Sequence, residues 1–303
     1  MFKKFIALFF ALFFCLVGKS AFALGVSAQA AILIDAHTEE VLFNKNADKK
    51  MPMASTTKIM TAICTIENTN TNMPVKIDSR SAGVEGSSIY LNVGEVISIK
   101  ELLYGMMLNS GNDAATALAI ATSGSVEEFA SLMNKTAKKI GAQSTNFVNP
   151  SGLYDENHYT TARDLARITA YALKNPLFRD IVSTREMKIS SNTEEGVRYL
   201  KNHNKLLWQY EGCTGVKTGY TKKCGRCLVS SCKKNGRELI AVTLSAPDDW
   251  HDHSSLFDYG FSKLKPSLPS PQKEAGASVA AATKSAEGFI DIFKNNLLMF
   301  LIQ

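Results

Sequence analysis

The sequence predicts an α/β fold: a mostly antiparallel sheet flanked by helices, joined to a helical lobe. Strand patterns occur near both ends of the mature chain, and the middle shows apolar residues at spacings of three and four, which is typical of packed amphipathic helices. With 303 residues, 45% of them hydrophobic and 20% charged, the chain can bury one large core or two smaller ones. A cleft between sheet and lobe is the expected site.

The first 23 residues are typical of a cleaved signal peptide. Lys3 and Lys4 precede thirteen uncharged apolar residues, and Ala21 and Ala23 offer an A-x-A-like cleavage site. Thirteen residues fall short of the roughly 20 needed to cross a bilayer, so a cleaved leader is favoured over a membrane anchor. We therefore expect an exported, extracytoplasmic protein whose folded domain covers residues 24–264.

The charge balance argues against one class of partner. The whole chain carries a net charge of +6, and loss of residues 1–23 leaves 31 basic and 28 acidic side chains. No run of Lys or Arg stands out, and export separates the protein from nucleic acid. We expect no nucleic-acid partner.

Five cysteines remain after export, and three interpretations of them are open. Four could form a thiolate zinc site, two could form a disulfide, or all could be reduced, partly buried thiols. The alternation of CLVSSC is typical of a strand, whereas zinc knuckles lie on turns, so reduced thiols are favoured. The odd number leaves at least one free thiol if pairing is intramolecular. The five are Cys64, Cys213, Cys224, Cys227 and Cys232.

A hairpin and a helix open the mature chain. Two apolar runs, residues 31–34 and 41–43, flank the polar segment DAHTEE, which is a hairpin signal. A helix is predicted from about Ser55 to Glu67. Residues 75–100 then form a loop with short strands.

The centre of the chain is predicted to be helical, and the last part returns to strands. Strands on both sides of a helical block imply that the first and last strands are neighbours in one sheet. Helices are predicted over residues 100–110, 112–124, 125–142 and 161–175. Strands are predicted over residues 185–191, 215–221, 226–234 and 237–246, before a closing helix over residues 253–264.

The composition changes after the closing helix. Residues 265–288 are rich in Pro, Ala and Ser, which is typical of a linker. Residues 289–303 form an apolar tail that is too short to span a bilayer, so it either lies in the membrane interface or packs on the domain. Attachment to the outer face of the cytoplasmic membrane is favoured, because the polar residues of the tail fall near one side.

Ser55 and Lys58 stand one helical turn apart at the start of the first predicted helix. A serine hydroxyl is a poor nucleophile unless a base takes its proton, and a lysine can be that base only if its pKa is lowered. Burial beside Ile59 and Ala62, a second cation and the positive end of the helix would each lower it. The alternative is a serine cap beside a solvated lysine, the commoner meaning of an isolated S-x-x-K.

A second candidate group lies in a turn between two predicted helices. Ser110 could relay a proton toward a leaving amine, and the amide of Asn112 could hold both Lys58 and a substrate carbonyl. The alternative is a helix N-terminus with Asp113 in its first turn.

A third group lies on a predicted strand. Lys217 and Thr218 offer a cation and a hydroxyl to a carboxylate, and Gly219 removes a side chain where another backbone could approach. An extended substrate could pair with the edge of this strand.

The order S-x-x-K, S-x-N and K-T-G, each in its predicted helix-start, turn or strand context, is far more specific than any one motif. The sequence resembles the penicillin-interacting serine D,D-peptidases, most closely the low-molecular-weight D-alanyl-D-alanine carboxypeptidases. The resemblance covers residues 28–264, and it implies a β-lactamase/transpeptidase-like fold with the active site between sheet and lobe. It makes residues 24–264 a D,D-peptidase catalytic domain.

The resemblance implies roles in the attack. Ser55 would attack the carbonyl between the last two D-Ala residues of a peptidoglycan stem pentapeptide, with Lys58 accepting its proton. Ser110 and Asn112 would assist proton transfer to the departing D-Ala. The activity would serve peptidoglycan biosynthesis and cell shape.

The resemblance also implies substrate-binding groups. The backbone N–H groups of Ser55 and Tyr220 would form the oxyanion hole. Lys217 and Thr218, beside Gly219, would orient the terminal carboxylate of the peptide.

Water would then hydrolyse the acyl-enzyme. His158 matches a residue that the family places near this step, although a structural role at a helix entry is an equal alternative. The family is inhibited by β-lactam antibiotics, which acylate the serine, and its chemistry needs no metal or organic cofactor.

Two departures from the family pattern stand out. Family members often carry an arginine shortly before the closing helix that helps bind the substrate carboxylate. This chain offers Asp248, Asp249, His251 and His253 there, so carboxylate recognition either differs or depends on Lys217 and Thr218. Many relatives also have a β-rich domain before the anchor, for which residues 265–288 leave no room.

Two other functions are compatible with parts of this pattern. A serine β-lactamase shares the acylation apparatus but needs a fast deacylating base, and no convincing E-x-x-L-N lies between Asn112 and Lys217. A non-catalytic wall-binding module of the same fold is disfavoured because Ser55, Lys58 and Gly219 are all intact.

Overall fold

The computed structural model describes residues 24–191 and 196–264. The predicted signal peptide, linker and tail, residues 1–23, 265–288 and 289–303, lie outside the described residues. None of the helices in the described ranges has the length and apolar character needed to cross a membrane.

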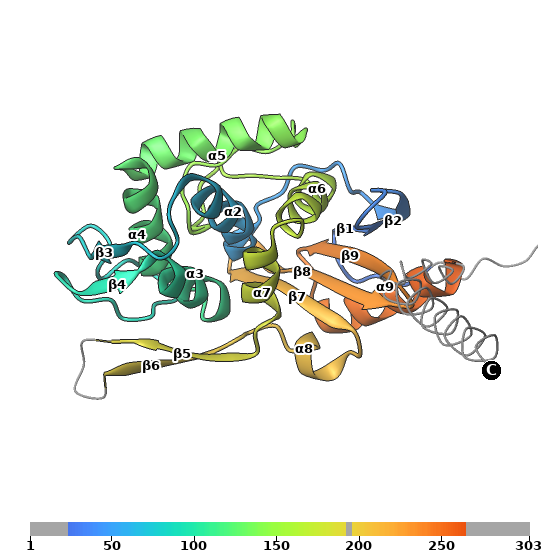
Figure 1. The fold of residues 1–303 in the computed structure, drawn as a ribbon. Helices are drawn as coiled ribbons and strands as arrows, with labels where there is room; N and C mark the ends of the chain where they lie inside the picture. The colour runs from blue at the N-terminus through green and yellow to red at the C-terminus, as the bar shows by residue number, and fades with distance from the viewer. Residues whose placement is uncertain (1–23, 192–195, 265–303) are drawn as a thin grey trace, which may run out of the picture. The chain divides into compact units, whose positions relative to one another are not determined.

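A five-stranded antiparallel sheet forms the centre of the fold, with strand order β2-β1-β9-β8-β7 (Figure 1). The predicted hairpin of the first two strands is confirmed, with Leu33 opposite Phe43. The prediction that the first and last strands are neighbours is also confirmed, since Ile32 pairs with Val242. The strands are β1 (Ala30–Asp35), β2 (Val41–Lys45), β7 (Cys213–Thr221), β8 (Gly225–Lys234) and β9 (Arg237–Leu244).

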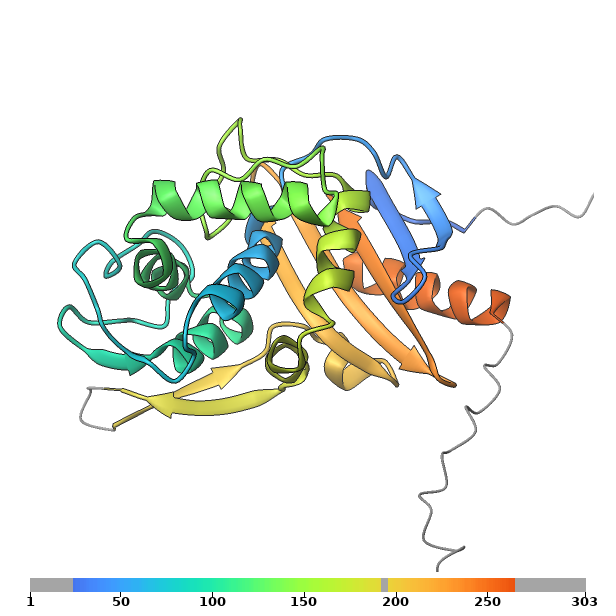
Figure 2. The same ribbon diagram turned by 45° about the horizontal axis from the view of Figure 1, so that its top comes forward.

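Helices cover both faces of this sheet (Figure 2). The side chains of β1 alternate between two cores: Ile32 joins the core shared with the helical lobe, whereas Leu33 joins the core under α9 (Asp249–Lys263). Against the first core lie α6 (Ala162–Ala172) and α7 (Pro176–Ser183). Period-two alternation on a strand therefore positions the sheet between helical layers.

The helical lobe surrounds α2, whose first eight residues are all buried. Because a helix buried on every side must lie inside a core, α2 holds its first residue at a fixed place beside the sheet. The lobe comprises a single 3-10 turn, η1 (Ala54–Thr57), and α2 (Lys58–Asn68), α3 (Ile99–Leu108), α4 (Asn112–Ser123) and α5 (Val126–Ile140), with the short strands β3 (Pro74–Lys76) and β4 (Val96–Ser98).

Several elements differ from the sequence prediction. Helix α7 was missed, although Asn175 caps it and Pro176 occupies its first position, both start signals. Strand β6 (Val197–Lys201), which pairs with β5 (Glu186–Ser190), was missed because only one of its side chains is buried, so no alternation shows. The short α8 (Leu206–Gln209) was also missed, and α9 begins four residues earlier than predicted.

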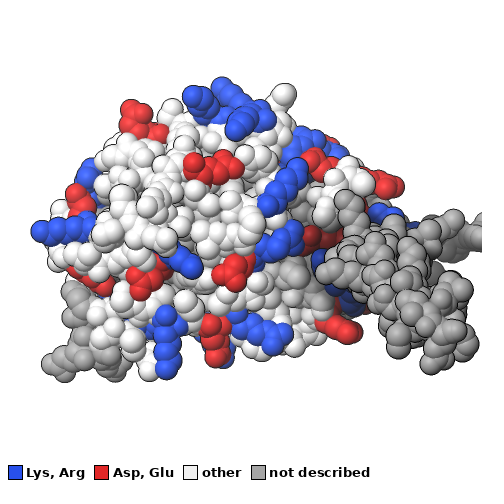
Figure 3. Space-filling view, viewed as in Figure 1, with Lys and Arg blue, Asp and Glu red and all other residues white. Residues whose placement is uncertain are grey.

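Charged side chains of both signs are interspersed on the face of the described residues shown in Figure 3. This agrees with the small net charge and gives that face no field of a single sign.

Candidate active site

Ser55 lies on the 3-10 turn η1, immediately ahead of α2. Its neighbour Ala54 has φ +48°, a left-handed conformation that a residue with a Cβ adopts only under local strain. Lys58 is the first residue of α2, and its Nζ lies 3.0 Å from Ser55 Oγ. The predicted contact of these two side chains is confirmed.

The amine of Lys58 is fully buried and contacts three oxygens. Besides Ser55 Oγ, it donates to Asn112 Oδ1 at 2.7 Å and to Ser151 O at 2.5 Å. Burial lowers its pKa well below the usual range, the charge of Lys217 lowers it further, and Asp113 opposes them. When neutral, the amine gives its two N–H groups to the asparagine and the carbonyl, which leaves its lone pair for the serine proton.

Asn112, the first residue of α4, is held by a loop that precedes α3. Its Nδ2 donates to Glu85 O at 2.6 Å, and its backbone N–H donates to Ser87 O at 2.7 Å. The amide therefore contacts Lys58 as predicted, with one of its N–H groups occupied by the loop. Ser110 has φ +62° in the turn before α4 and lines the same cavity as Ser55.

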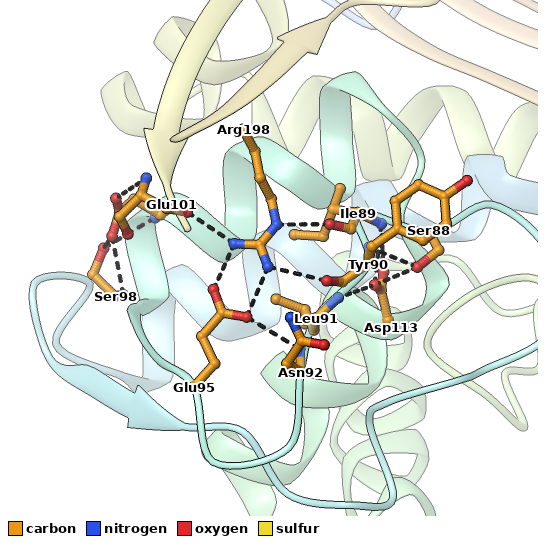
Figure 4. A network of polar contacts seen from close by, with 11 residues as sticks. Ser88, Ile89, Tyr90, Leu91, Asn92, Glu95, Ser98, Glu101, Asp113 and Arg198 are labelled. Atoms are coloured by element: carbon orange, nitrogen blue, oxygen red, sulfur yellow. Dashed lines mark hydrogen bonds and ion pairs between the residues drawn. The ribbon is translucent and has the colours of Figure 1, made fainter. Parts of the chain in front are cut away.

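The loop is itself clamped by Arg198, which reaches it from β6 (Figure 4). All five N–H donors of the guanidinium are used: two meet Glu95 at 2.5 and 2.7 Å, and the others meet the carbonyls of Ile89, Tyr90 and Ser190. This pair is almost entirely buried.

Asp113 holds the same loop from the opposite side. Its carboxylate accepts the backbone N–H groups of Ile89 and Leu91 and the hydroxyl of Ser88 (Figure 4). The sequence suggested this aspartate only as part of a helix start. Arg198 carried no sequence signal at all, because its role depends on the packing of the β5–β6 hairpin against a distant loop.

Strand β7 places the K-T-G motif, residues 217–219, next to the backbone of Ser55. A Cβ on Gly219 would lie 2.9 Å from Ser55 N, so only glycine lets the strand pass this close to the backbone of η1. Lys217 is buried, donates to Thr218 O at 3.0 Å, and burial lowers its pKa to about 7. Tyr220 follows with its side chain 64% exposed.

A cavity of about 820 Å³ opens over these groups. Ser55, Ser110 and Thr218 line it, together with the exposed side chains of Tyr220 and Trp208. Its floor is the contact between β7 and η1, so the cleft predicted between sheet and lobe is confirmed.

Comparisons with known proteins decide the family. A model of the D-alanyl-D-alanine carboxypeptidase family, peptidase S11, matches residues 18–248. The chain belongs to this family. It is 35% identical over 283 residues to the D-alanyl-D-alanine carboxypeptidase DacF of Bacillus subtilis, covering 91% of this chain and 72% of the relative. It is 34% identical over 255 residues to the D-alanyl-D-alanine carboxypeptidase of Streptomyces sp. strain K15, covering 78% and 88% of the two chains.

Solved structures give the same result for the fold. The Streptomyces K15 DD-transpeptidase matches with a TM-score of 0.75 and 32% identity, covering 78% of this chain and 98% of that one. A penicillin-binding protein homolog from Mycobacterium tuberculosis matches with a TM-score of 0.76 and 29% identity, covering 82% and 97%. The predicted fold and the resemblance to serine D,D-peptidases are confirmed, and the chain is a serine peptidase of this family.

His158 of this carboxypeptidase family member is buried, with both ring nitrogens occupied. Nδ1 accepts the N–H of Val148 at 3.1 Å, which leaves the proton on Nε2, 2.8 Å from the Thr57 hydroxyl. Burial lowers its pKa to about 4. This geometry supports the structural alternative, because no ring nitrogen remains to activate a water.

The four-thiolate zinc alternative is wrong. Cys213 lies opposite Cys232 at one end of the β7–β8 hairpin, whereas Cys227 lies opposite Gly219, five residues along the strand. Strand geometry separates these positions by about 16 Å, too far for shared coordination. All five cysteines of the described ranges are free thiols in this structure.

The cavity also contains an arginine that the sequence did not single out. Arg226 on β8 lies opposite Tyr220, lines the cavity, and has a side chain that is 48% exposed. Its ion pair with Asp249 is long, at 4.0 Å, and its guanidinium has no closer ionic partner among the described residues. A guanidinium is thus available beside Thr218.

Proposed function

We propose that this chain is a serine D,D-carboxypeptidase that removes the terminal D-Ala from peptidoglycan stem pentapeptides through an acyl-enzyme on Ser55. The buried amine of Lys58, 3.0 Å from Ser55 Oγ and with a lowered pKa, carries the proposal. A neutral amine beside a serine hydroxyl is what attack at neutral pH requires. Membership of the family supports the same reaction.

Acylation begins as the Ser55 proton passes to Lys58 Nζ and Oγ bonds to the carbonyl carbon. Negative charge develops on the carbonyl oxygen, where the backbone N–H groups of Ser55 and Tyr220 stabilise it beside the space kept open by Gly219. The proton then passes by way of Ser110 to the nitrogen of the departing D-Ala. The C–N bond breaks and an ester on Ser55 remains.

Deacylation consumes one water. Lys58, neutral again once D-Ala has left, takes a proton from the water as its oxygen attacks the ester carbonyl. Ser55 regains its proton, and a tetrapeptide is released. His158 supports the turn that carries Ser55 through Thr57, so we assign it a positioning role rather than this step.

The terminal carboxylate of the substrate is bound by Thr218 and Arg226. Lys217 is buried and has a pKa of about 7, so at neutral pH it carries a positive charge only part of the time. The half-exposed guanidinium of Arg226 offers paired donors, which suit a carboxylate. Asp249, which lies beside Arg226, belongs to the segment in which family members often carry an arginine and this chain has none, so the cation comes from β8 instead.

Release of D-Ala from a pentapeptide ending in D-Ala-D-Ala tests this function. Wild-type protein should release one D-Ala per peptide, and Ser55→Ala should release none. Release that Ser55→Ala leaves unchanged would overturn the proposal. Rapid hydrolysis of benzylpenicillin without peptide cleavage would indicate a β-lactamase, and binding of wall fragments with neither reaction would indicate the non-catalytic module.

We further propose that the protein works outside the cytoplasm, on the cell wall, with residues 289–303 attached to the outer face of the membrane. The apolar leader and the amphipathic tail of the sequence support this location. Protein comprising residues 24–303 should sediment with anionic lipid vesicles, whereas residues 24–264 should stay in solution. Equal behaviour of the two would exclude attachment by the tail.

A further inference from the structure

Cys213 and Cys232 lie directly opposite each other on β7 and β8. The N–H of Lys233 donates to Gly212 O at 2.8 Å, the bond that brackets a non-hydrogen-bonded antiparallel pair. Such pairs have Cα atoms about 4.5 Å apart, with both side chains on one face of the sheet. A disulfide needs Cα atoms about 4.4 to 6.8 Å apart, so the backbone already has the required spacing.

The two thiols differ in exposure. Cys232 is fully buried in the core under α9, and its Sγ donates to Glu211 O at 3.5 Å. Cys213 is partly exposed, and its Sγ donates to Gly215 O at 3.4 Å. Each thiol therefore makes only one weak hydrogen bond to a backbone carbonyl. A change of side-chain rotamer can break that bond and turn the two sulfur atoms toward each other. Cys213 is thus the more accessible residue of the two, and Cys232 lies directly opposite it on the neighbouring strand.

No other pair of cysteines in the described ranges has this arrangement. Cys227 faces a glycine across the strands, Cys224 precedes β8, and Cys64 lies inside α2. Among the cysteines of the described ranges, only Cys213 and Cys232 are directly opposed across two strands, which favours this pairing over the others that the sequence left open.

We propose that Cys213 and Cys232 form a reversible disulfide when the protein meets a small-molecule disulfide. The Cys213 thiolate attacks the oxidant RSSR, which gives a mixed disulfide and releases RSH. The Cys232 thiolate then attacks the Cys213 sulfur, which releases the second RSH. Two thiol protons and two electrons pass to the oxidant, and one S–S bond forms in the protein.

The bridge would fasten the end of β7 that lies four residues before Lys217. The register of the two strands shifts between Cys213 and Gly215, so the bond fixes the end of the hairpin beyond that shift and leaves the K-T-G segment in place. It closes residues 214–231 into a loop and restricts the unfolded chain, which stabilises the fold.

Both thiols stay protonated at neutral pH. Burial raises the pKa of Cys213 to about 11 and that of Cys232 to about 12, so the exchange is slow there and faster in alkaline buffer. The charged or titratable groups that influence the pair are Arg185, Tyr210, Lys234, Glu238 and Asp258.

Oxidised glutathione at mildly alkaline pH tests the proposal. Full-length protein should lose two hydrogens in mass, yield one peptide pair joined through Cys213 and Cys232, and melt several degrees higher until a reductant is added. Cys213→Ser should abolish these changes, and the matched control Cys224→Ser should keep them.

A persistent glutathione adduct on Cys213, or a bridge that includes another cysteine, would overturn the proposal. So would the absence of any cross-link. Release of D-Ala, measured on the same oxidised sample, should stay within about twofold of the reduced sample, and it reports separately on the proposed function.

Discussion

At the level of single residues, the central feature is Lys58, a lysine whose pKa the fold lowers well below its usual range. Lys58 lies in the core with Lys217 nearby, and both effects lower its pKa. The sequence predicted the Ser55 and Lys58 contact because it depends on local helix geometry. The sequence could not predict that Arg226 lines the site, because the position of Arg226 beside Thr218 depends on the register between β7 and β8.

Replacing Lys217 should move the pH dependence of acylation. Lys217→Met removes a positive charge that disfavours protonated Lys58, so the pKa of Lys58 rises. The acidic limb of the acylation rate against pH, measured with benzylpenicillin, should shift to higher pH. Lys205→Met, which changes a lysine on the cavity wall, is the control and should leave the midpoint in place. An unchanged or lower midpoint in Lys217→Met would contradict the electrostatic coupling.

Replacing Arg226 should weaken recognition of the peptide carboxylate. Arg226→Leu is expected to raise KM for a D-Ala-D-Ala peptide about tenfold or more, since it removes the charge-assisted hydrogen bonds between the guanidinium and the peptide carboxylate. Arg226→Lys should retain part of the affinity, and Arg237→Leu, outside the cavity lining, should have no effect. A peptide whose C-terminus is amidated should react equally poorly with wild type and Arg226→Leu. Unchanged KM for the free acid would exclude this role.

At the scale of elements, the site depends on a loop clamped between β6 and α4. Arg198 and Asp113 fix the segment that in turn holds Asn112 (Figure 4). The main strands and most helices follow from apolar periodicity and were predicted. The clamp was not predicted, because Arg198 and Glu95 are about one hundred positions apart in the sequence. Strand β6, which carries Arg198, has only one buried side chain and therefore shows no alternation of apolar and polar residues.

Loosening the clamp should slow acylation more than it weakens ligand binding. Arg198→Lys keeps the charge but replaces five planar donors by three, so the loop carbonyls lose partners and Asn112 is held less firmly. We expect a roughly tenfold lower acylation rate, with the dissociation constant of the non-covalent penicillin complex changed less. The control is Arg80→Lys, which alters an exposed Arg–Asp pair. Equal acylation rates for wild type and Arg198→Lys would show that the clamp is only structural.

At the scale of the whole molecule, two cores on opposite faces of one sheet are joined through β1 and β9. The fold class was predictable because strands at both ends of a helical block leave few arrangements. From the sequence the cavity could be located only as a cleft between sheet and lobe, since its lining combines Ser55 and Ser110 of the lobe with residues of β6, β7, β8, α8 and α9.

Buried histidine should make the stability of the fold sensitive to acid. In the folded state the pKa of His158 is lowered to about 4, whereas the unfolded chain takes a proton near 6.5. Between these values the unfolded state binds more protons, so the free energy of unfolding falls as the pH decreases from 6.5 to 4. His158→Gln should reduce the steepness of this dependence in urea unfolding, to which the buried His253 also contributes, and the exposed His37→Gln should leave it unchanged. Parallel curves for wild type and His158→Gln would contradict the assignment.

The intact mass of the mature protein, followed over time after mixing with benzylpenicillin, shows whether Ser55 is the nucleophile. We expect one long-lived adduct on wild type and none on Ser55→Ala, because the nucleophile is Ser55 activated by Lys58. An adduct that persists in Ser55→Ala would contradict it, as would a wild-type protein that never reacts.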